Sequence, residues 1–122
     1  MTKSKVIRLA TNEEAGPHVV PVWYIYRNRR FYIGTRLGSR KAKNIRRDPR
    51  VGFCIDVGIN EPDIYGVAGQ GRARLITDAS VKGIATEILL RYFDEMTEAA
   101  QALLDDTDCI IEITPSRMWN WI

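Results

Sequence analysis

The chain has little of the side-chain chemistry on which most enzymes depend. It contains one histidine, His18, and two cysteines, Cys54 and Cys109, which lie far apart in the sequence. Zinc sites need clustered histidine or cysteine ligands, and a Ser-His-Asp or Cys-His set would depend on His18 alone. The sequence has no Walker-type loop and no dinucleotide-binding glycine motif. We therefore expect no metal site and no catalytic side chain, so any enzymatic step would need a bound cofactor.

Long hydrophobic runs and export signals are also missing. No apolar run approaches the ~20 residues that cross a bilayer as a helix, and residues 1–5 lack a signal-peptide pattern. We expect a cytoplasmic protein that does not bind membranes. In that compartment the two cysteines are expected to be buried thiols rather than a disulfide.

The positive charge of the chain is concentrated in one segment. The net charge is +3, but residues 36–50 alone carry +6, which leaves −3 on the rest of the chain. The cations of this segment are Arg36, Arg40, Lys41, Lys43, Arg46, Arg47 and Arg50. Such local charge indicates a local anionic ligand. Because the segment has no aromatic residues on which bases could stack, we expect no nucleic-acid partner.

Hydrophobic periodicity predicts one domain over residues 1–122, with more β than α structure. Strands are predicted over 6–10, 18–26, 31–35, 51–57, 64–76 and 109–114, with an extended segment over 118–122. Helices are predicted from Gly38 or Ser39 to about residue 47, from Asp78 or Ser80 to 92, and from Thr97 to about residue 104. This order indicates an α+β fold whose sheet closes into a barrel with short flanking helices.

Prolines and acidic residues refine this outline. Pro21 lies inside a strand that is apolar on both faces, and it predicts a sheet edge because proline has no N–H for a ladder. Pro115 is expected to break the last strand, and a loop is expected over 58–63. Asp105, Asp106 and Asp108 are expected to form a solvated turn.

One segment, residues 32–45, combines a strand end, a turn of small residues and a helix start. The first turn of a helix has amide N–H groups without intrahelical acceptors and lies at the positive end of the helix dipole. Thr35 and Ser39 add hydroxyl groups, and Arg40 and Lys41 add full charges. A phosphate would meet all three kinds of donor there. From the residues alone, an exposed basic helix cap remains the alternative.

Four pieces of the sequence, in the same order, are similar to the pyridoxamine 5′-phosphate oxidase-like FMN-binding split-barrel superfamily. They are the strand over 17–24, the Gly-Ser-Arg-Lys-Ala turn at 38–42 with the Asp-Pro-Arg-Val at 48–51, the Gly-Gln-Gly-Arg-Ala-Arg-Leu strand at 69–75, and the ending at 113–119. The resemblance implies a split β-barrel with Greek-key antiparallel topology. It also implies a homodimer with two FMN sites at the interface.

The resemblance assigns roles to individual residues. Ser39, Arg40 and Lys41 would hold the phosphate, and Thr35 would lie beside the ribityl chain. The backbone of Val20, Pro21, Val22 and Trp23 would follow the isoalloxazine ring. Trp119 or Trp121 would reach the ring from the other subunit, although a tryptophan near the end of a chain also fits plain packing.

The same resemblance implies an FMN-dependent oxidoreductase acting on a small molecule. Pyridoxamine phosphate oxidases carry a lysine where this chain has Tyr24, and their arginine-rich last strand is replaced by residues 119–122. We therefore expect a substrate other than a B6 vitamer. Two alternatives stay open: a reductase that uses a deazaflavin coenzyme along Arg36, Lys43, Arg46 and Arg47, and a non-catalytic FMN carrier or electron-transfer protein.

Overall fold

The computed structural model describes residues 6–58 and 65–121, and this part of the chain folds into a sheet with three helices. The strands are β1 (Ile7–Glu13), β2 (Gly16–Val22), β3 (Ile25–Arg27), β4 (Arg30–Thr35), β5 (Arg50–Gly58), β6 (Tyr65–Ile76) and β7 (Cys109–Trp121). The helices are α1 (Arg40–Arg47), α2 (Val81–Tyr92) and α3 (Glu98–Asp106). The α+β, mainly β prediction is confirmed, whereas the loop expected over 58–63 lies almost wholly outside the described residues.

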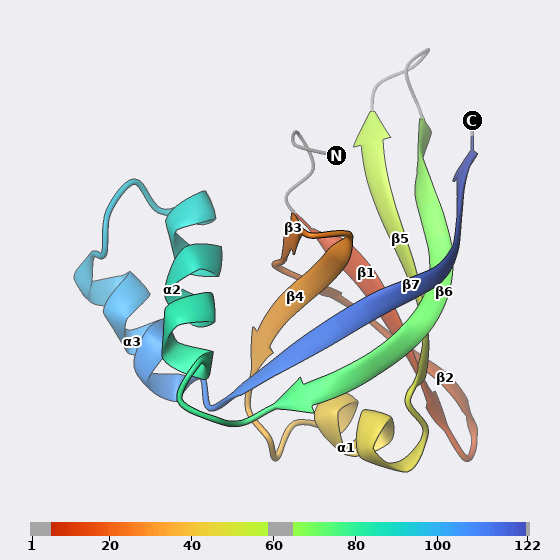
Figure 1. Ribbon diagram of the computed structural model, residues 1–122, viewed down its shortest axis with the longest axis horizontal. Coiled ribbons are helices and arrows are strands. Elements are labelled where there is room, and N and C mark those ends of the chain that lie inside the picture. Colours follow the sequence, from red (N-terminus) through yellow and green to blue (C-terminus); the bar gives the residue numbers. More distant parts are fainter. Residues whose placement is uncertain (1–5, 59–64, 122) are drawn as a thin grey trace.

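The strands form one antiparallel sheet in the order β2-β1-β5-β6-β7-β4-β3. The sheet coils strongly, and β7 runs across the molecule between β6 and β4 (Figure 1). Since β2 and β3 are both edges in this order, the sheet over the described residues does not close. The expected barrel is therefore split between these two strands.

The split arises where one long strand was expected over 18–26. The structure divides this segment into β2 and β3 at Trp23 and Tyr24. The backbone of Tyr24 bonds to a helix there: its N–H donates to Tyr92 Oη at 3.0 Å, and its carbonyl accepts from Arg91 at 2.6 Å. Pro21 does lie on an edge strand, as expected. One face of this apolar strand lies open in the single chain, since Pro17, Val19 and Pro21 are exposed.

The last strand is also longer than expected. Pro115 does not break β7, which pairs with β6 from Ile110 to Trp121. The pairing shifts register between Gln70 and Gly71, so that one extra residue of β7, Ser116, lies between two paired positions. A bulge of this kind accommodates a proline because the ladder is already interrupted there.

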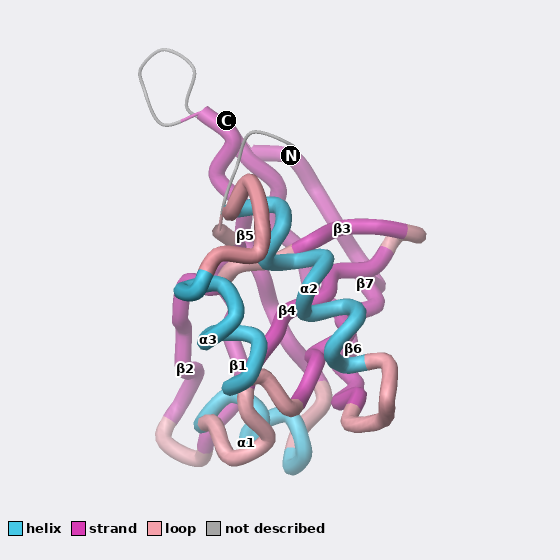
Figure 2. Tube along the Cα trace, turned by 90° about the vertical axis from the view of Figure 1, so that its left-hand side faces the viewer, coloured by secondary structure: helices cyan, strands magenta, loops and turns pink. Residues whose placement is uncertain are grey.

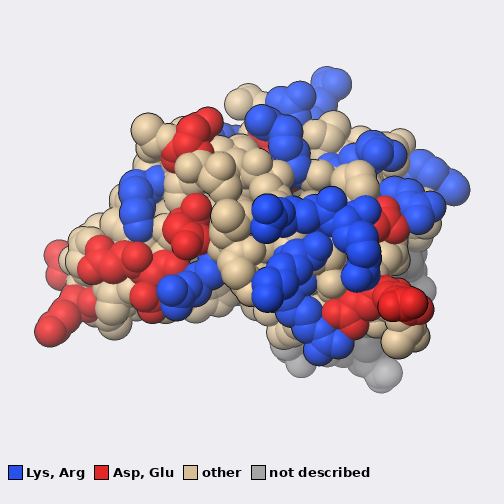
Figure 3. Space-filling model, turned by 90° about the horizontal axis from the view of Figure 1, so that it is seen from below, with Lys and Arg blue, Asp and Glu red and all other residues tan. Residues whose placement is uncertain are grey.

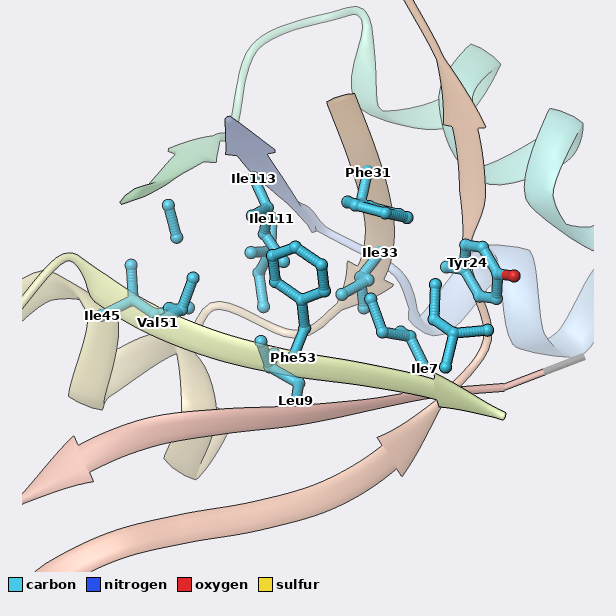
Figure 4. Close-up of a cluster of buried hydrophobic side chains, with 12 residues drawn as sticks. Ile7, Leu9, Tyr24, Phe31, Ile33, Ile45, Val51, Phe53, Ile111 and Ile113 are labelled. Carbon is cyan, nitrogen blue, oxygen red and sulfur yellow. The ribbon is translucent and has the colours of Figure 1, made fainter. Parts of the chain in front are cut away.

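Two hydrophobic clusters lie on opposite faces of β4 and β7. Phe31 and Ile33 of β4 join the larger cluster inside the coiled sheet, which Figure 4 shows, whereas Tyr32 joins the smaller cluster under α2. Successive residues of β7 divide in the same way, with Ile111 and Ile110 on opposite sides. These two strands are therefore buried on both faces.

The helices occupy two places around the sheet. In Figure 2, α2 and α3 lie together on one side of the sheet, and α1 lies at one end of it. The helix begins where the sequence predicts, and Ser39 caps α1 by accepting a hydrogen bond from the amide of Ala42 at 3.3 Å. None of the helices in the described ranges is long and apolar enough to cross a membrane.

Candidate functional site

A cleft of about 880 Å³ lies where the end of β2, the β4–α1 turn and the α2–α3 pair meet. Six of the nine cofactor-binding residues predicted from the sequence line it: Pro21, Val22, Trp23, Thr35, Ser39 and Lys41. These residues come from two segments at opposite ends of the sheet, since β2 is the first strand in the order and β4 is the last but one. The other lining residues are Gly34, Arg36, Gly38, Ile88, Leu89, Leu103, Asp106, Thr107 and Asp108.

The polar end of the cleft is the turn that leads into α1. The hydroxyl of Thr35, which is buried, donates to Ser39 Oγ at 3.0 Å, and the amide of Ser39 donates to the carbonyl of Arg36 at 2.9 Å. These bonds hold the turn so that the first residues of α1 lie at the cleft. Amide groups in a first helical turn have no intrahelical acceptor, and the helix dipole is positive there. The turn therefore favours an anion.

Lys41 is the partly buried cation that the start of α1 brings to the cleft, which the exposed Arg36 also lines. Burial lowers the pKa of the Lys41 ammonium group from its usual 10.5. No carboxylate or carbonyl within residues 6–58 and 65–121 forms an ion pair or hydrogen bond with it. A desolvated cation without a counter-charge is unfavourable, and an anion in the cleft would relieve that cost.

Arg40, the neighbouring predicted phosphate ligand, lies elsewhere. Its guanidinium forms an ion pair with Glu13 of β1, with one N–O distance of 2.6 Å. Glu13 also accepts from Asn44 at 3.0 Å, and these two hydrogen bonds, Arg40 first, lower the pKa of Glu13 to about 2. Asn44 in turn donates to Thr11 at 3.0 Å. Arg40 therefore fastens α1 to β1 instead of lining the cleft.

Val20 and Trp119 are the other predicted residues that do not line the cleft. Trp119 lies on β7 opposite Ala68, with 43% of its side chain exposed and the guanidinium of Arg117 at 5.6 Å from its ring centroid. Because the sequence assigns Trp119 to the site of another subunit, its role stays a prediction. The side chain of Trp121 is outside the described part of the structure.

An aromatic stack fixes the apolar end of the cleft. The ring of Trp23 lies parallel to that of Tyr92, with 4.3 Å between centroids and 7° between planes, and Phe93 contacts it edge-on at 5.9 Å. The same Tyr92 hydroxyl accepts the N–H of Tyr24. The end of α2 therefore positions both the backbone and the indole ring that face the cleft.

The α2–α3 wall of the cleft is the part that the sequence did not reveal. Asp108 was expected in a solvated turn, but its Oδ1 accepts the amide of Leu37 at 2.7 Å. The signal that could have revealed this contact is the pairing of β4 with β7, which places Cys109 opposite Thr35. Once that register is known, Asp108 must lie beside the turn that follows Thr35.

Charge is distributed unevenly around the cleft. Seen from below in Figure 3, Lys and Arg side chains gather over the region of α1, and Asp and Glu side chains gather at the end formed by α2 and α3. Residues 94–108 contain six acids and no cation. Within the described ranges no three histidine, cysteine or acidic side chains are arranged to hold a metal ion.

Comparison with known protein families shows to which family the chain belongs. The family model described as pyridoxamine 5′-phosphate oxidase matches residues 1–122. The chain belongs to this family. Members of the family carry out oxidoreductase chemistry, although the solved relatives include proteins with other roles. No curated protein matches the chain.

Solved structures with the same fold confirm the split-barrel architecture. A conserved hypothetical protein of Mycobacterium tuberculosis is 26% identical with a TM-score of 0.84, covering 98% of this chain and 78% of the other. A protein described as F420 reductase is 19% identical with a TM-score of 0.76, covering 97% and 91%. The heme storage protein HutZ of Vibrio cholerae is 15% identical with a TM-score of 0.72, covering 98% and 87%.

Proposed function

We propose that the chain is a flavin-binding oxidoreductase that holds FMN in the cleft and acts on a small molecule other than a B6 vitamer. The observation that carries this proposal is Lys41, a partly buried cation at the start of α1 that forms no ion pair within the described residues. The family match supports a phosphate-bearing flavin as the anion. FMN, when bound, would supply the hydride-transfer chemistry that this histidine-poor chain does not offer in its side chains.

The residues of the cleft fit such a ligand. Its volume of about 880 Å³ falls within the ~300–1,000 Å³ that small-molecule sites usually occupy. Lys41 and the hydroxyl of Ser39 would bind the phosphate, with the hydroxyl of Thr35 beside them. Pro21, Val22 and Trp23 would lie along the ring. Ile88 and Leu89, buried residues of α2, would keep water from the apolar end.

A second copy of the chain is part of this proposal. Val19 of β2 and Met118 and Trp119 of β7 expose 57%, 44% and 43% of their surface, respectively, and burial of such apolar surface would favour association. A homodimer in which Trp119 or Trp121 reaches the partner's cleft would cover them. Sedimentation should then show a dimer at micromolar concentration, and a monomer would overturn this arrangement.

A deazaflavin coenzyme is the second candidate ligand. It carries a phosphodiester and an acidic tail, and cations continue from the cleft along the exposed side of α1: Arg36 lines the cleft, and Lys43 and Arg46 are exposed beyond it. The structural neighbour described as F420 reductase favours the same ligand. In this case the function is that of a deazaflavin-dependent reductase.

The visible absorption spectrum of the purified chain tests the proposal. FMN is added in slight excess, unbound ligand is removed, and the retained chromophore is measured; the experiment is repeated with the deazaflavin coenzyme. Retention of FMN supports the first candidate, and retention of the deazaflavin alone supports the second. A protein that retains neither contradicts both. Turnover with an artificial electron acceptor then separates an enzyme from a non-catalytic carrier.

A further inference from the structure

Asp108 lies at the junction of α3 and β7 and forms hydrogen bonds with Thr35 and Leu37, at the start of the turn that leads into α1. Its Oδ1 accepts the amide of Leu37 at 2.7 Å, and its own amide donates to the carbonyl of Thr35 at 3.2 Å. The turn from Arg36 to Ser39 is closed by a single backbone hydrogen bond of 2.9 Å. The carboxylate of Asp108 therefore fixes the N–H group of a central residue of that turn.

Packing does little to brace the same turn. A Cβ atom added at Gly38, its other central residue, would meet no atom within 4 Å. The geometry of the turn consequently depends on hydrogen bonds more than on contacts. Two small backbone rotations at Leu37 and Gly38 would move Ser39 and the first turn of α1 relative to the cleft.

Asp108 is itself held by the helical pair. Lys82 of α2 donates to the carbonyls of Leu104 and Thr107, each at 2.8 Å. The hydroxyl of Thr107 donates to the carbonyl of Leu103 at 2.8 Å. These bonds add donors to carbonyls at and just after the end of α3, where the regular intrahelical pattern stops; the carbonyl of Leu104 also accepts the amide of Thr107 at 3.1 Å. Thr107, the residue before Asp108, is thus fixed to α2 and α3, and the carboxylate of Asp108 fixes the turn on the other side.

We propose that Asp108 is a positioning residue that sets the anion-binding turn, so that the α2–α3 pair controls how tightly a phosphate is held. The proposal rests on the proposed function, because it concerns the same cleft. Asp108 also lines the cleft, and its negative charge opposes a phosphate there. Positioning and repulsion act on affinity in opposite directions, which makes them separable by mutation.

Asp106 supplies a matched control. It also lines the cleft, but the described part of the chain offers its carboxylate no hydrogen bond. Replacing Asp106 with alanine removes charge alone. Replacing Asp108 with alanine removes the same charge together with the acceptor for Leu37. If charge were the whole effect, both variants would bind an anion more tightly.

The test measures the dissociation constants of FMN and riboflavin by flavin fluorescence, with the full chain and each variant. Riboflavin lacks the phosphate, so the ratio of the two constants reports the phosphate contact. We expect Asp108→Ala to weaken FMN binding by roughly five- to tenfold, the scale of one ordinary hydrogen bond, with little change for riboflavin. Asp106→Ala should leave FMN binding unchanged or tighter.

Two further variants separate positioning from folding. Asp108→Asn keeps an oxygen acceptor without the charge, so it should restore FMN binding to the unmutated level or above. Asp108→Glu keeps the charge but displaces the carboxylate, so it should weaken FMN binding even though electrostatics are unchanged. Equal behaviour of Asp108→Ala and Asp106→Ala, or wild-type affinity in Asp108→Glu, overturns the proposal. If the unmutated chain binds FMN no better than riboflavin, the proposed function itself fails, and the inference fails with it.

Discussion

Lys41 allows the sharpest test of the cleft, because it is a partly buried cation that lines the cleft and has no ion-pair partner among residues 6–58 and 65–121. Lys41→Met keeps the length and apolar character of the side chain and removes the charge. Lys43→Met is the matched control, since Lys43 is a lysine of the same helix that is exposed and does not line the cleft. Both variants lower the net charge of the chain equally, so any long-range electrostatic effect is common to them.

The expected loss follows from the contact that Lys41 would make. A hydrogen bond between charged groups contributes about 1.5–3 kcal/mol, whereas the bare attraction of two unit charges about 4 Å apart at an effective dielectric of about 20 is about 4 kcal/mol. Partial exposure and salt reduce the second figure towards the first. Lys41→Met should therefore raise the dissociation constant of FMN about 10- to 100-fold, and Lys43→Met should change it by less than about twofold.

The assay is a fluorescence titration with FMN and with riboflavin at moderate ionic strength. Riboflavin binding should be nearly the same in all three proteins. Because burial lowers the pKa of Lys41, the folded apo-protein disfavours its charge, and Lys41→Met should not lower the unfolding temperature. A binding loss without a stability loss points to the ligand contact. Equal FMN affinity in Lys41→Met and the unmutated chain would refute the placement of the phosphate.

The pH dependence of the same titration has a definite sign. FMN affinity should rise as the phosphate loses its second proton near pH ~6, and it should fall again at alkaline pH as Lys41 deprotonates. The pKa of Lys41 in the apo-protein is lowered by burial, so the fall should begin below the usual 10.5 of the group. Lys41→Arg, which keeps its proton throughout, should remove the alkaline fall. An unchanged alkaline fall in Lys41→Arg would assign it to another group.

Three further predictions concern the scaffold. Glu13, whose pKa is lowered to about 2 by Arg40 and Asn44, contributes stability above its unfolded pKa that is lost as pH falls towards 2; Glu13→Gln should flatten the acid side of the stability curve measured by urea unfolding. Gly69→Ala would place a Cβ 2.5 Å from the carbonyl oxygen of Arg117, so it should lower the free energy of unfolding by about 1–3 kcal/mol or more. Gly83→Ala is the control: its Cβ would meet no atom within 4 Å inside α2, so it should raise that free energy by about 0.5–1 kcal/mol. A similar unfolding temperature for both variants would contradict the strand geometry. Tyr92→Phe removes the hydrogen bonds to the Tyr24 backbone and should cost about 1 kcal/mol in urea unfolding, with no effect expected if the end of β2 does not depend on α2.

Local sequence patterns were sufficient for most of the helices and strands and for six of the residues that line the cleft. The small-residue turn, the helix start near Ser39 and the proline-marked edge of β2 are properties of a few adjacent residues, and all are found in the structure. The break at Trp23 and Tyr24 was not predictable in this way. It depends on Arg91 and Tyr92, almost seventy positions later, bonding to a backbone that would otherwise continue a strand. The hydrogen bond of Asp108 was not predictable for the same reason, because its partner Leu37 is brought to it only by the pairing of β4 and β7.

Arg40 and Lys41 are adjacent in the predicted motif but lie on different sides of α1 in this structure. Consecutive residues of an α-helix point about 100° apart, so two adjacent cations at the start of α1 begin in different directions. Lys41 lies on the side of the cleft, and Arg40 lies on the side of β1, where Glu13 pairs with it. A sequence motif records that both residues are present but not which direction each takes. For Arg40 the direction follows from Glu13, which lies at the end of β1 and accepts hydrogen bonds from its guanidinium.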